Sequence, residues 1–434
     1  MQGAGPVAPP LPGGATIDVC VIGGGLTGLS TALRLRELGL TVIVLERGYA
    51  GVGASGRNAG HLTPTVGKDL PTLRKLFGIE RAKALIALVQ LAIGQVEETI
   101  AQHGIACDYE PVGNVMAAVH AGQHATVDAA AEAGAALGLD GELLDDAALR
   151  ARGIPEAFTR GYLMRRGGIL DPGRYVLGLR DVVRAAGVEL YEGTPVLRIE
   201  DGDPVVLHTR GGRVRAKAAV LATNAYTPDL GWLGSKVLRV HVSLFRTGAL
   251  AEPERRAVGW PGREGIYTAH EVLESYRLTR DDRIVGGAKR VRYAYRGRAL
   301  GDDPGTHRFI EQAFRDRFPE LRDVEVTERW SGPIAFALDF LPAVGRTGRH
   351  HNVYYSVGYA GHGLALASYA GTMLADLMSE RDGPGSALWA HRKIPLPPEP
   401  LRWLTVRAIN GYLEAKDRRA DLAARAARAA AHRF

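Results

Sequence analysis

The chain has 434 residues, is 46% hydrophobic and carries a formal net charge of +7 at pH 7. This length allows two or three domains with a large core, and the composition is ordinary for a globular protein. Much of the positive charge lies among alanines after Lys416, and no basic stripe with interleaved aromatic residues occurs, so we expect no nucleic-acid partner. No apolar run approaches the roughly 20 residues that span a bilayer, so we expect no stable membrane insertion. The two cysteines, Cys20 and Cys107, show no ligand or disulfide spacing, which predicts no metal site and favours a cytoplasmic location.

The first structural signal is a strand, a glycine turn and a helix near the start of the chain. An apolar strand over 17–22 leads into a G-x-G-x-x-G turn at 23–28, and a second apolar strand over 41–45 ends at Glu46. In such a turn Gly23 allows the tight bend, Gly25 lets the backbone approach a pyrophosphate, and Gly28 packs the helix on the strand. The pyrophosphate lies on the amides at the helix start. Glu46 comes about 20 residues later, where a carboxylate accepts ribose hydroxyls. This segment predicts a dinucleotide-binding βαβ unit.

A polar, glycine-rich loop over 51–61 follows the second strand. Its small residues permit close backbone approach, and Ser55, Arg57 and Asn58 offer donors to the edge of a flat polar ring. A flexible surface loop is the alternative interpretation, and a nicotinamide dehydrogenase would share the preceding turn.

Further elements of a nucleotide fold recur in the middle of the chain and again near its end. Short strands are predicted between 188 and 222 and at 353–357, whereas 236–300 alternates like antiparallel strands. The fold class is therefore α/β (α+β overall), a Rossmann-like ββα domain interleaved with a β-rich substrate or cap domain. We expect 16–67, 160–235 and 325–395 in the nucleotide domain and 68–159 and 236–324 in the second. Residues 1–15 are expected to be a disordered lead-in, and 396–434 a C-terminal extension with a basic Ala/Arg tail.

Several blocks make the chain recognisable when taken in order. They are the loop 53–60 (Gly-Ala-Ser-Gly-Arg-Asn-Ala-Gly), 218–226, 282–287, 330–332 with 339–345, and 358–363. Together they resemble the FAD-dependent amine and amino-acid oxidases of the D-amino-acid oxidase/glycine oxidase superfamily, most of all the γ-glutamylputrescine oxidase branch. The resemblance covers about residues 16–415.

The resemblance implies FAD as the cofactor. Non-covalent binding is favoured because the loop lacks the histidine pattern of covalent members and no cysteine follows Cys107; His61 is the one nearby histidine for a covalent link. The turn would hold the pyrophosphate, the loop would line the isoalloxazine ring, and the block at 361–364 would bring a helix start to the pyrimidine edge. The implied FAD-binding residues are Gly23, Gly25, Leu26, Thr27, Gly28, Glu46, Arg47, Ser55, Arg57, Asn58, Ala59, Gly60, His61, Val196, Ala222, Thr223, Gly332, Gly361, His362, Gly363 and Leu364.

The implied reaction is oxidation of a C–N bond in a small-molecule amine or amino acid, with hydride transfer to flavin N5. The imine product is hydrolysed, and O2 reoxidises the flavin to give H2O2. A γ-glutamylputrescine-like substrate is favoured. Lys289 is a candidate for oxygen activation, and Arg246, Tyr276 and Tyr359 are candidates for substrate binding, with His270 and Arg277 in the same strand region. The alternatives are a dehydrogenase of the same fold that uses a quinone or carrier protein, and a tailoring oxidase of a larger metabolite. A nicotinamide dehydrogenase and a non-catalytic protein that uses its basic tail at a membrane are more distant alternatives. The oligomeric state is left open.

Overall fold

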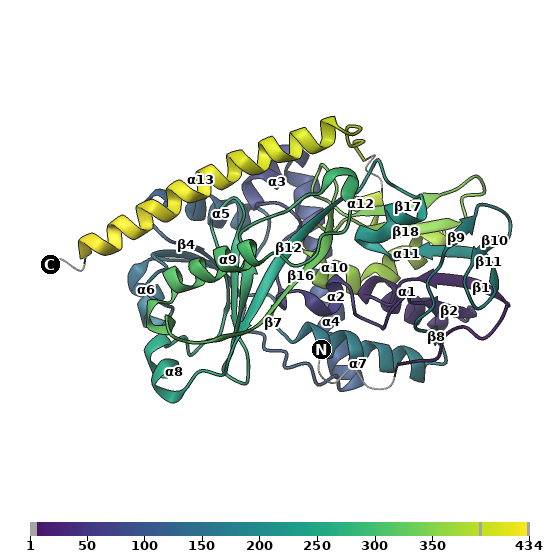
Figure 1. The fold of residues 1–434 in the computed structure, drawn as a ribbon, viewed down its shortest axis with the longest axis horizontal. Coiled ribbons are helices and arrows are strands. Elements are labelled where there is room, and N and C mark those ends of the chain that lie inside the picture. The colour runs from purple at the N-terminus through teal and green to yellow at the C-terminus, as the bar shows by residue number, and fades with distance from the viewer. Residues whose placement is uncertain (1–6, 390–392, 432–434) are drawn as a thin grey trace.

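The nucleotide-binding domain is built on a largely parallel sheet. In the computed structural model, which describes residues 7–389 and 393–431, its strands run in the order β17-β18-β11-β1-β2-β8 (Figure 1). Neighbouring strands are parallel except β17 and β18. An antiparallel hairpin of β9 and β10 extends β11. The strands are β1 (Ala15–Ile22), β2 (Val42–Leu45), β8 (Glu189–Tyr191), β9 (Arg198–Glu200), β10 (Val205–His208), β11 (Arg213–Leu221), β17 (Ala343–Thr347) and β18 (Val353–Val357).

The glycine turn joins β1 to helix α1 (Leu26–Glu37) as the sequence predicts. All four residues of β2 and the last four of β1 are buried, which is typical of a parallel strand covered on both faces. Helix α1 packs against α7 (Pro172–Ala185), α10 (Gly363–Ser368) and α11 (Ala370–Met378). Helix α7 begins where expected, because Asp171 accepts a hydrogen bond from the Arg174 amide and Pro172 occupies the first turn.

The second domain contains a mostly antiparallel sheet in the order β16-β12-β15-β14-β13-β4-β6-β5. Only the β13–β4 pair is parallel among these described strands. The strands are β4 (Asn114–Ala118), β5 (Gly141–Leu144), β6 (Arg160–Met164), β12 (Leu238–Thr247), β13 (Gly265–Thr268), β14 (Glu274–Leu278), β15 (Ile284–Ala288) and β16 (Val326–Phe336). A small separate pair is formed by β3 (His61–Leu62) and β7 (Gly168–Ile169). The remaining helices are α2 (Ala54–Arg57), α3 (Leu70–Phe77), α4 (Ile79–His103), α5 (His124–Ala136), α6 (Asp146–Ala151), α8 (Glu252–Val258), α9 (Pro304–Arg317), α12 (Ser386–Trp389) and α13 (Leu401–Ala431).

Two expected domain boundaries are wrong by one strand each. Strand β6 was expected in the nucleotide domain but pairs antiparallel with β4 in the second sheet. Strand β16 was likewise expected in the nucleotide domain but pairs with β12 over almost its whole length. Both segments border the nucleotide domain in sequence, and only their long-range pairing assigns them to the second sheet.

Helix α4 qualifies the expectation about membrane spans. By length and composition alone it could cross a membrane, with a mean hydropathy of 1.4 in its most apolar window. In the structure, however, its apolar residues pack in the core: Leu85, Ile86, Leu88, Val89, Ala92, Ile93 and Val96 are all buried. A core helix of a globular domain passes the same test, so α4 is weak evidence for insertion.

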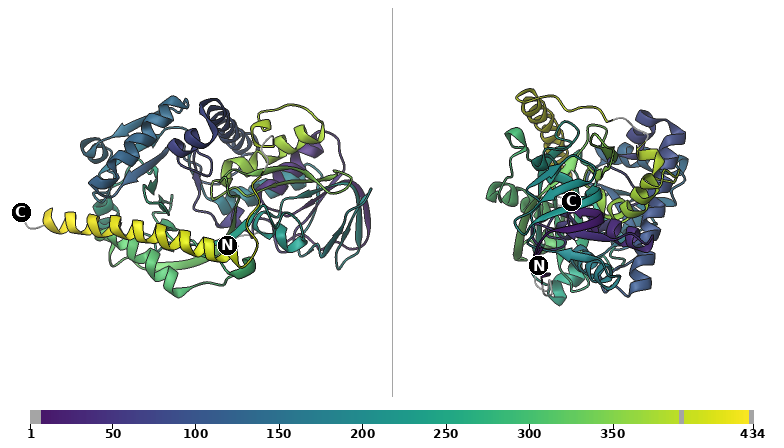
Figure 2. Two further views of the ribbon diagram at one scale, coloured as in Figure 1. Left: turned by 90° about the horizontal axis from the view of Figure 1, so that it is seen from above. Right: turned by 90° about the vertical axis from the view of Figure 1, so that its right-hand side faces the viewer.

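Both expected tails differ from the prediction. Residues 7–15 are not a disordered lead-in: Ala8 and Leu11 are buried, and the amide of Leu11 donates to the hydroxyl of Thr194 at 3.0 Å. Residues 1–6 lie outside the described residues. The C-terminal extension forms the 31-residue helix α13, which runs along the second domain and projects past it at its C-terminal end (Figures 1 and 2). Two of its own residues, Asp417 and Ala424, are buried, so α13 is docked on this domain.

Candidate active site

The glycine turn forms a cradle in which side chains cannot be accommodated. Gly23 has φ = +109°, and a Cβ there would lie 2.8 Å from the carbonyl oxygen of Ala222. A Cβ on Gly28 would lie 1.8 Å from the carbonyl oxygen of Gly23, so α1 can approach β1 only because this residue is glycine. At Gly25 the nearest atom to an added Cβ is Ser55 Oγ at 2.8 Å. The same oxygen accepts a hydrogen bond from the Leu26 amide at 3.0 Å, which brings the loop to the start of α1.

Glu46 lies at the predicted ribose position. Its side chain is buried, and its two oxygens accept hydrogen bonds from the amides of Gly24 (2.7 Å) and Gly48 (2.8 Å). Burial raises the pKa of this carboxyl group, although the two amides act in the opposite direction. Each carboxylate oxygen keeps acceptor capacity for a further donor such as a ribose hydroxyl. Next to it, the Arg47 guanidinium stacks on the Tyr226 ring at 3.8 Å.

The loop over 51–61 is ordered by its own side chains rather than flexible. The Asn58 amide donates to the carbonyls of Ala54 and Ser55 and accepts from the Gly60 amide, so Asn58 shapes the loop and is not free to donate to a ring. Arg57 donates to the Ser331 carbonyl at 3.1 Å, and Trp330 Nε1 donates back to the Arg57 carbonyl at 2.9 Å. These bonds bring the loop against β16, where a Cβ on Gly332 would lie 3.4 Å from Arg57 Cζ.

The other predicted flavin contacts gather at the C-terminal ends of the parallel strands. The Ala222 amide donates to the Ile22 carbonyl at 3.0 Å, and the Thr223 hydroxyl bonds to that of Thr227. Gly361 has φ = +84°, and α10 begins two residues later, at Gly363. The remaining members of this group are His362, whose pKa burial lowers, the buried Leu364 and Thr27, and Val196 at the edge of the apolar cluster beside β9. Ligands of open α/β sheets bind at this edge.

The protonation state of His61 follows from its hydrogen bond to Asn114. Asn114 Nδ2 donates to the carbonyls of Leu62 and Gly168, so its oxygen must face His61 Nδ1 at 3.0 Å. His61 Nδ1 therefore carries the hydrogen, and Nε2 is left as a buried acceptor without a partner among the described residues. Burial lowers the pKa of His61 to about 4, so the imidazole is neutral at physiological pH.

One face of the second sheet, the roof of the site, lies over this loop. Directly paired residues share a face, and the row Leu244, Gly287, Ser275 and Tyr267 runs across β12, β15, β14 and β13. Arg277 is two residues beyond Ser275 on β14, and its Nε donates to the Ala59 carbonyl of the loop at 2.9 Å. Its side chain is buried, yet among residues 7–389 and 393–431 it has no ion-pair partner, and burial lowers its pKa to about 10. The sequence places Arg277 in this strand region but favours Tyr276 as the substrate ligand; the period-2 alternation along β14 is the signal that separates the two.

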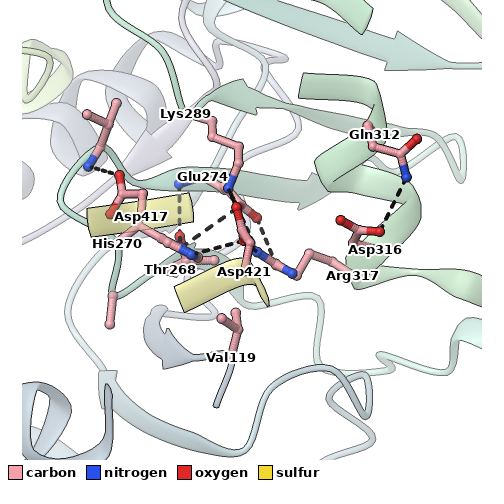
Figure 3. A network of polar contacts seen from close by, with 12 residues as sticks. Val119, Thr268, His270, Glu274, Lys289, Gln312, Asp316, Arg317, Asp417 and Asp421 are labelled. Carbon is pink, nitrogen blue, oxygen red and sulfur yellow. Dashed lines mark hydrogen bonds and ion pairs between the residues drawn. The ribbon is translucent and has the colours of Figure 1, made fainter. Parts of the chain in front are cut away.

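Lys289 is not placed as predicted for oxygen activation. Its amine is buried and forms ion pairs with Glu274 and, at 2.9 Å, with Asp421 of α13 (Figure 3). Glu274 lies two residues before Tyr276 on β14, so both side chains are on the same face, toward α9 and away from the loop. Lys289 is therefore part of a buried charge cluster on the opposite face of the sheet.

The three predicted substrate ligands are also engaged elsewhere. Tyr276 packs edge-on against Phe318 at 5.0 Å and donates to Glu274, so it belongs to the core under α9. The Tyr359 hydroxyl bonds to Thr27 (2.7 Å) and Ser356 (2.8 Å), joining β18 to α1. Arg246 shares the face of Arg277, but its guanidinium is paired with Glu328. Strand alternation explains the first error, because Tyr276 and Arg277 are neighbours in sequence on opposite faces.

His270, Glu274 and Asp421 lie close enough together to be compared with a metal site. Lys289 and Arg317 already neutralise them: Arg317 donates to both oxygens of Glu274 at 3.0 and 2.9 Å. Although burial alone would raise it, Arg317 and Lys289 lower the pKa of Glu274 to about 2. Two cations inside the cluster give it the chemistry of an ion-pair network rather than a metal centre.

The glycine cradle, the buried acid after β2 and the sheet roof over the loop define a dinucleotide-binding oxidoreductase of the flavoenzyme class. Residues 18–377 match the family described as FAD dependent oxidoreductase (DAO), and the chain belongs to this family. It is 33% identical over 366 residues to gamma-glutamylputrescine oxidoreductase of Escherichia coli (strain K12), covering 84% of each chain. It is 29% identical to the probable oxidoreductase OrdL of Haemophilus influenzae, over 85% of this chain and 84% of that protein. Glycine oxidase from Geobacillus kaustophilus has a similar fold, with a TM-score of 0.74 and 21% identity, covering 88% of this chain and 100% of that one.

The residues present fit FAD, the cofactor of this family. A Cβ at Gly23, Gly25 or Gly28 would collide with neighbouring protein atoms, so only glycines allow the tight turn that a dinucleotide site requires, and Glu46 offers buried acceptors at the position expected for a ribose ligand. Among the described residues no cysteine follows Cys107, and His61 is committed through Nδ1 to Asn114. The protein is therefore an FAD-dependent oxidoreductase that acts on amines or amino acids.

Proposed function

We propose that the substrate is an amine that also carries a carboxylate, with a γ-glutamylputrescine-like compound favoured, and that O2 is the electron acceptor. FAD, when bound, supplies the hydride acceptor for the carbon that bears the nitrogen. The relative that is named for γ-glutamylputrescine supports the choice of substrate. The observation that carries the proposal is the buried, unpaired guanidinium of Arg277.

A buried cation that no carboxylate contacts is costly unless a ligand supplies the contact. The charges of Asp171, Asp108, Asp281 and Glu110 favour the charged form of Arg277, but none of these acids forms an ion pair with it among the described residues. Arg277 uses only Nε for the Ala59 carbonyl, so the outer edge of its guanidinium keeps donors in a planar fork that suits a carboxylate. Burial lowers its pKa only to about 10, so the group remains charged at neutral pH. An anionic substrate group would therefore be held against the roof of the site.

The other residues of the roof would exclude water and orient the rest of the substrate. Leu244 and Tyr267 provide mostly apolar surface, and Ser275 adds one hydroxyl between them. None of these groups takes part in the hydride transfer itself; they position the substrate.

The proposal is tested by adding substrates to the FAD-loaded protein without oxygen and recording the visible spectrum. γ-Glutamylputrescine should bleach the flavin band, and readmitted air should restore it with formation of H2O2. Putrescine, which lacks the carboxylate, should be oxidised with a much higher KM. Bleaching only by α-amino acids would replace the favoured substrate, and slow reoxidation in air with fast reoxidation by a quinone would replace the acceptor.

Two arginines of one hairpin provide a matched comparison. Arg277→Met should raise KM for γ-glutamylputrescine by about tenfold or more, because a charge-assisted pair is lost, while KM for putrescine changes little. Arg280→Met is the control, since that side chain is 69% exposed. Equal effects of Arg277→Met on both amines would contradict a carboxylate at Arg277, and the flavin content of each variant shows whether the loop remains intact.

A further inference from the structure

The C-terminal helix α13 turns its carboxylates toward the protein. Asp417 accepts hydrogen bonds from the backbone amides of Glu271 (2.8 Å) and Val272 (2.9 Å), and Asp421 pairs with Lys289 and Arg317 (Figure 3). Glu414, the one remaining acidic residue of 401–431, pairs with Arg290 at 3.1 Å. All three acids of this helix are thus engaged with the second domain.

The outward face of α13 carries an apolar stripe along its whole length. The large side chains on it are far more exposed than core residues: Leu401 is 55% exposed, Leu404 53%, Tyr412 68% and Leu422 54%. Positions three or four residues apart lie on one face of a helix, and the small exposed residues fill the stripe between these four. The stripe consists of Leu401, Leu404, Ala408, Tyr412, Ala415, Leu422 and Ala426, all of them exposed, and the exposed Arg419 interrupts it between Ala415 and Leu422.

Cations without partners accompany this stripe. Arg418 and Arg419 are exposed and have no hydrogen-bond or ion-pair partner within the described part of the chain. Lys416, on the flank, is 58% exposed although it pairs with Glu271. With its acids turned inward, the helix presents leucines, a tyrosine and free arginines outward, and α13 projects beyond the domain at one end (Figures 1 and 2).

We propose that the outer face of α13 binds an anionic lipid surface, lying flat on it without crossing it. A helix with an apolar stripe flanked by arginines and lysines is suited to the boundary between headgroups and acyl chains, where long cationic side chains reach the anionic headgroups. Charge complementarity favours this occupant over a second copy of the chain. Two such faces would bring Arg419 and its neighbours together, and the whole chain carries a net charge of +7.

The test uses the full-length, FAD-loaded protein and sedimentation with lipid vesicles. We expect binding to phosphatidylcholine vesicles that contain about a third phosphatidylglycerol, loss of that binding at about 0.5 M salt, and little binding to phosphatidylcholine alone. Arg418→Gln and Arg419→Gln should each weaken binding about fivefold. Leu404→Ser with Leu422→Ser should abolish it, because the apolar part of the stripe is then lost. All four side chains are exposed, so these variants should fold and retain flavin.

Matched controls come from exposed residues on other elements. Leu91→Ser on α4 (50% exposed) and Leu143→Ser on β5 (41% exposed) should bind vesicles like the unmodified protein, as should Arg256→Gln on α8. A Tyr412→Cys variant labelled with a polarity-sensitive dye should change its emission on anionic vesicles, since Cys20 and Cys107 are both buried and will not compete for the label.

Three results would overturn the proposal. They are equal binding to neutral and anionic vesicles, no binding to either, and binding that the stripe variants leave unchanged. Concentration-dependent dimers that Leu404→Ser dissociates, seen without any vesicle binding, would identify a second copy of the chain as the occupant instead.

Discussion

Asp421 and Lys289 form a 2.9 Å ion pair across the junction between α13 and the second sheet. Asp421 belongs to the C-terminal helix, and Lys289 directly follows β15. Arg317 of α9 and the buried His270 also contact this carboxylate. Burial would raise the pKa of Asp421, but the hydrogen bond with His270 and the charges of Lys289 and Arg317 hold it well below its usual range. The pair fixes α13 to strands whose other face forms the roof of the active site.

Removing this carboxylate should strongly destabilise the protein. Asp421→Ala leaves two buried cations short of a partner, and breaking a buried pair in this way typically costs about 3–5 kcal/mol. Arg425→Ala, one turn later on α13, is the control, because its pair with Asp316 involves a side chain that is 49% exposed and should cost less than about 1 kcal/mol. Denaturant unfolding of the two variants measures the difference, and equal losses would show that the cluster does not hold the helix.

Lys289→Met distinguishes a structural lysine from an oxygen-activating one. Because its amine is committed to Glu274 and Asp421, we expect lower stability but a rate of flavin reoxidation by O2 within about twofold of the unmodified protein. Stopped-flow mixing of the reduced enzyme with oxygen gives this rate directly. A fall on the order of tenfold or more would restore the oxygen-activating role that the sequence predicted.

Glu46→Gln should weaken FAD binding without changing the fold. The carboxylate accepts from the Gly24 and Gly48 amides, and its remaining acceptors face the ribose position, so a neutral amide should raise the Kd for FAD about tenfold or more. Asp18→Asn on β1 of the same domain is the control, because this acid pairs with Lys217, which is 81% exposed. Titration of the apoprotein with FAD measures both, and an unchanged Kd for Glu46→Gln would remove the ribose assignment.

The neutral state of His61 predicts a pH dependence of stability. Its pKa is lowered to about 4 in the folded protein, against about 6.5 for an unperturbed histidine. Between these values the unfolded chain binds more protons, so the free energy of unfolding should fall as the pH is lowered from 6.5 toward 4. His61→Gln keeps a donor for Asn114 and removes the titration. The slope should therefore be smaller in that variant, and identical slopes would mean that His61 is protonated in the folded state.

The nucleotide turn could be predicted from sequence because its determinants are local. Gly23, Gly28 and Glu46 act through spacing along one βαβ unit, and their structural roles follow the pattern. The roof could not be predicted in the same way. Whether Tyr276 or Arg277 faces the loop depends on the register of β14 against β15, in which Glu274 pairs with Ala288, and a one-residue change reverses every side chain.

The docking of α13 was missed for a related reason. Asp417 and Asp421 look like solvated charges in an Ala/Arg tail, and their partners, Glu271 to Val272 and Arg317, lie more than 100 residues away. Nothing within the tail itself indicates that its acids are buried. A helical wheel of 401–431 would have shown one signal, since its carboxylates and its exposed leucines fall on different faces.

Gly60 offers a test of how closely the flavin loop and the roof are joined. It has φ = +81°, and an added Cβ would lie 2.1 Å from the Leu170 carbonyl and 2.9 Å from Arg277 Nε. Gly60→Ala should therefore shift the loop or displace Arg277, raising KM for a carboxylate-bearing amine and changing the visible spectrum of the bound flavin. Gly53→Ala is a matched control in the same loop, because nothing lies within 4 Å of its added Cβ. If both alanines leave the spectrum and KM unchanged, the contact between Arg277 and the loop does not control substrate binding.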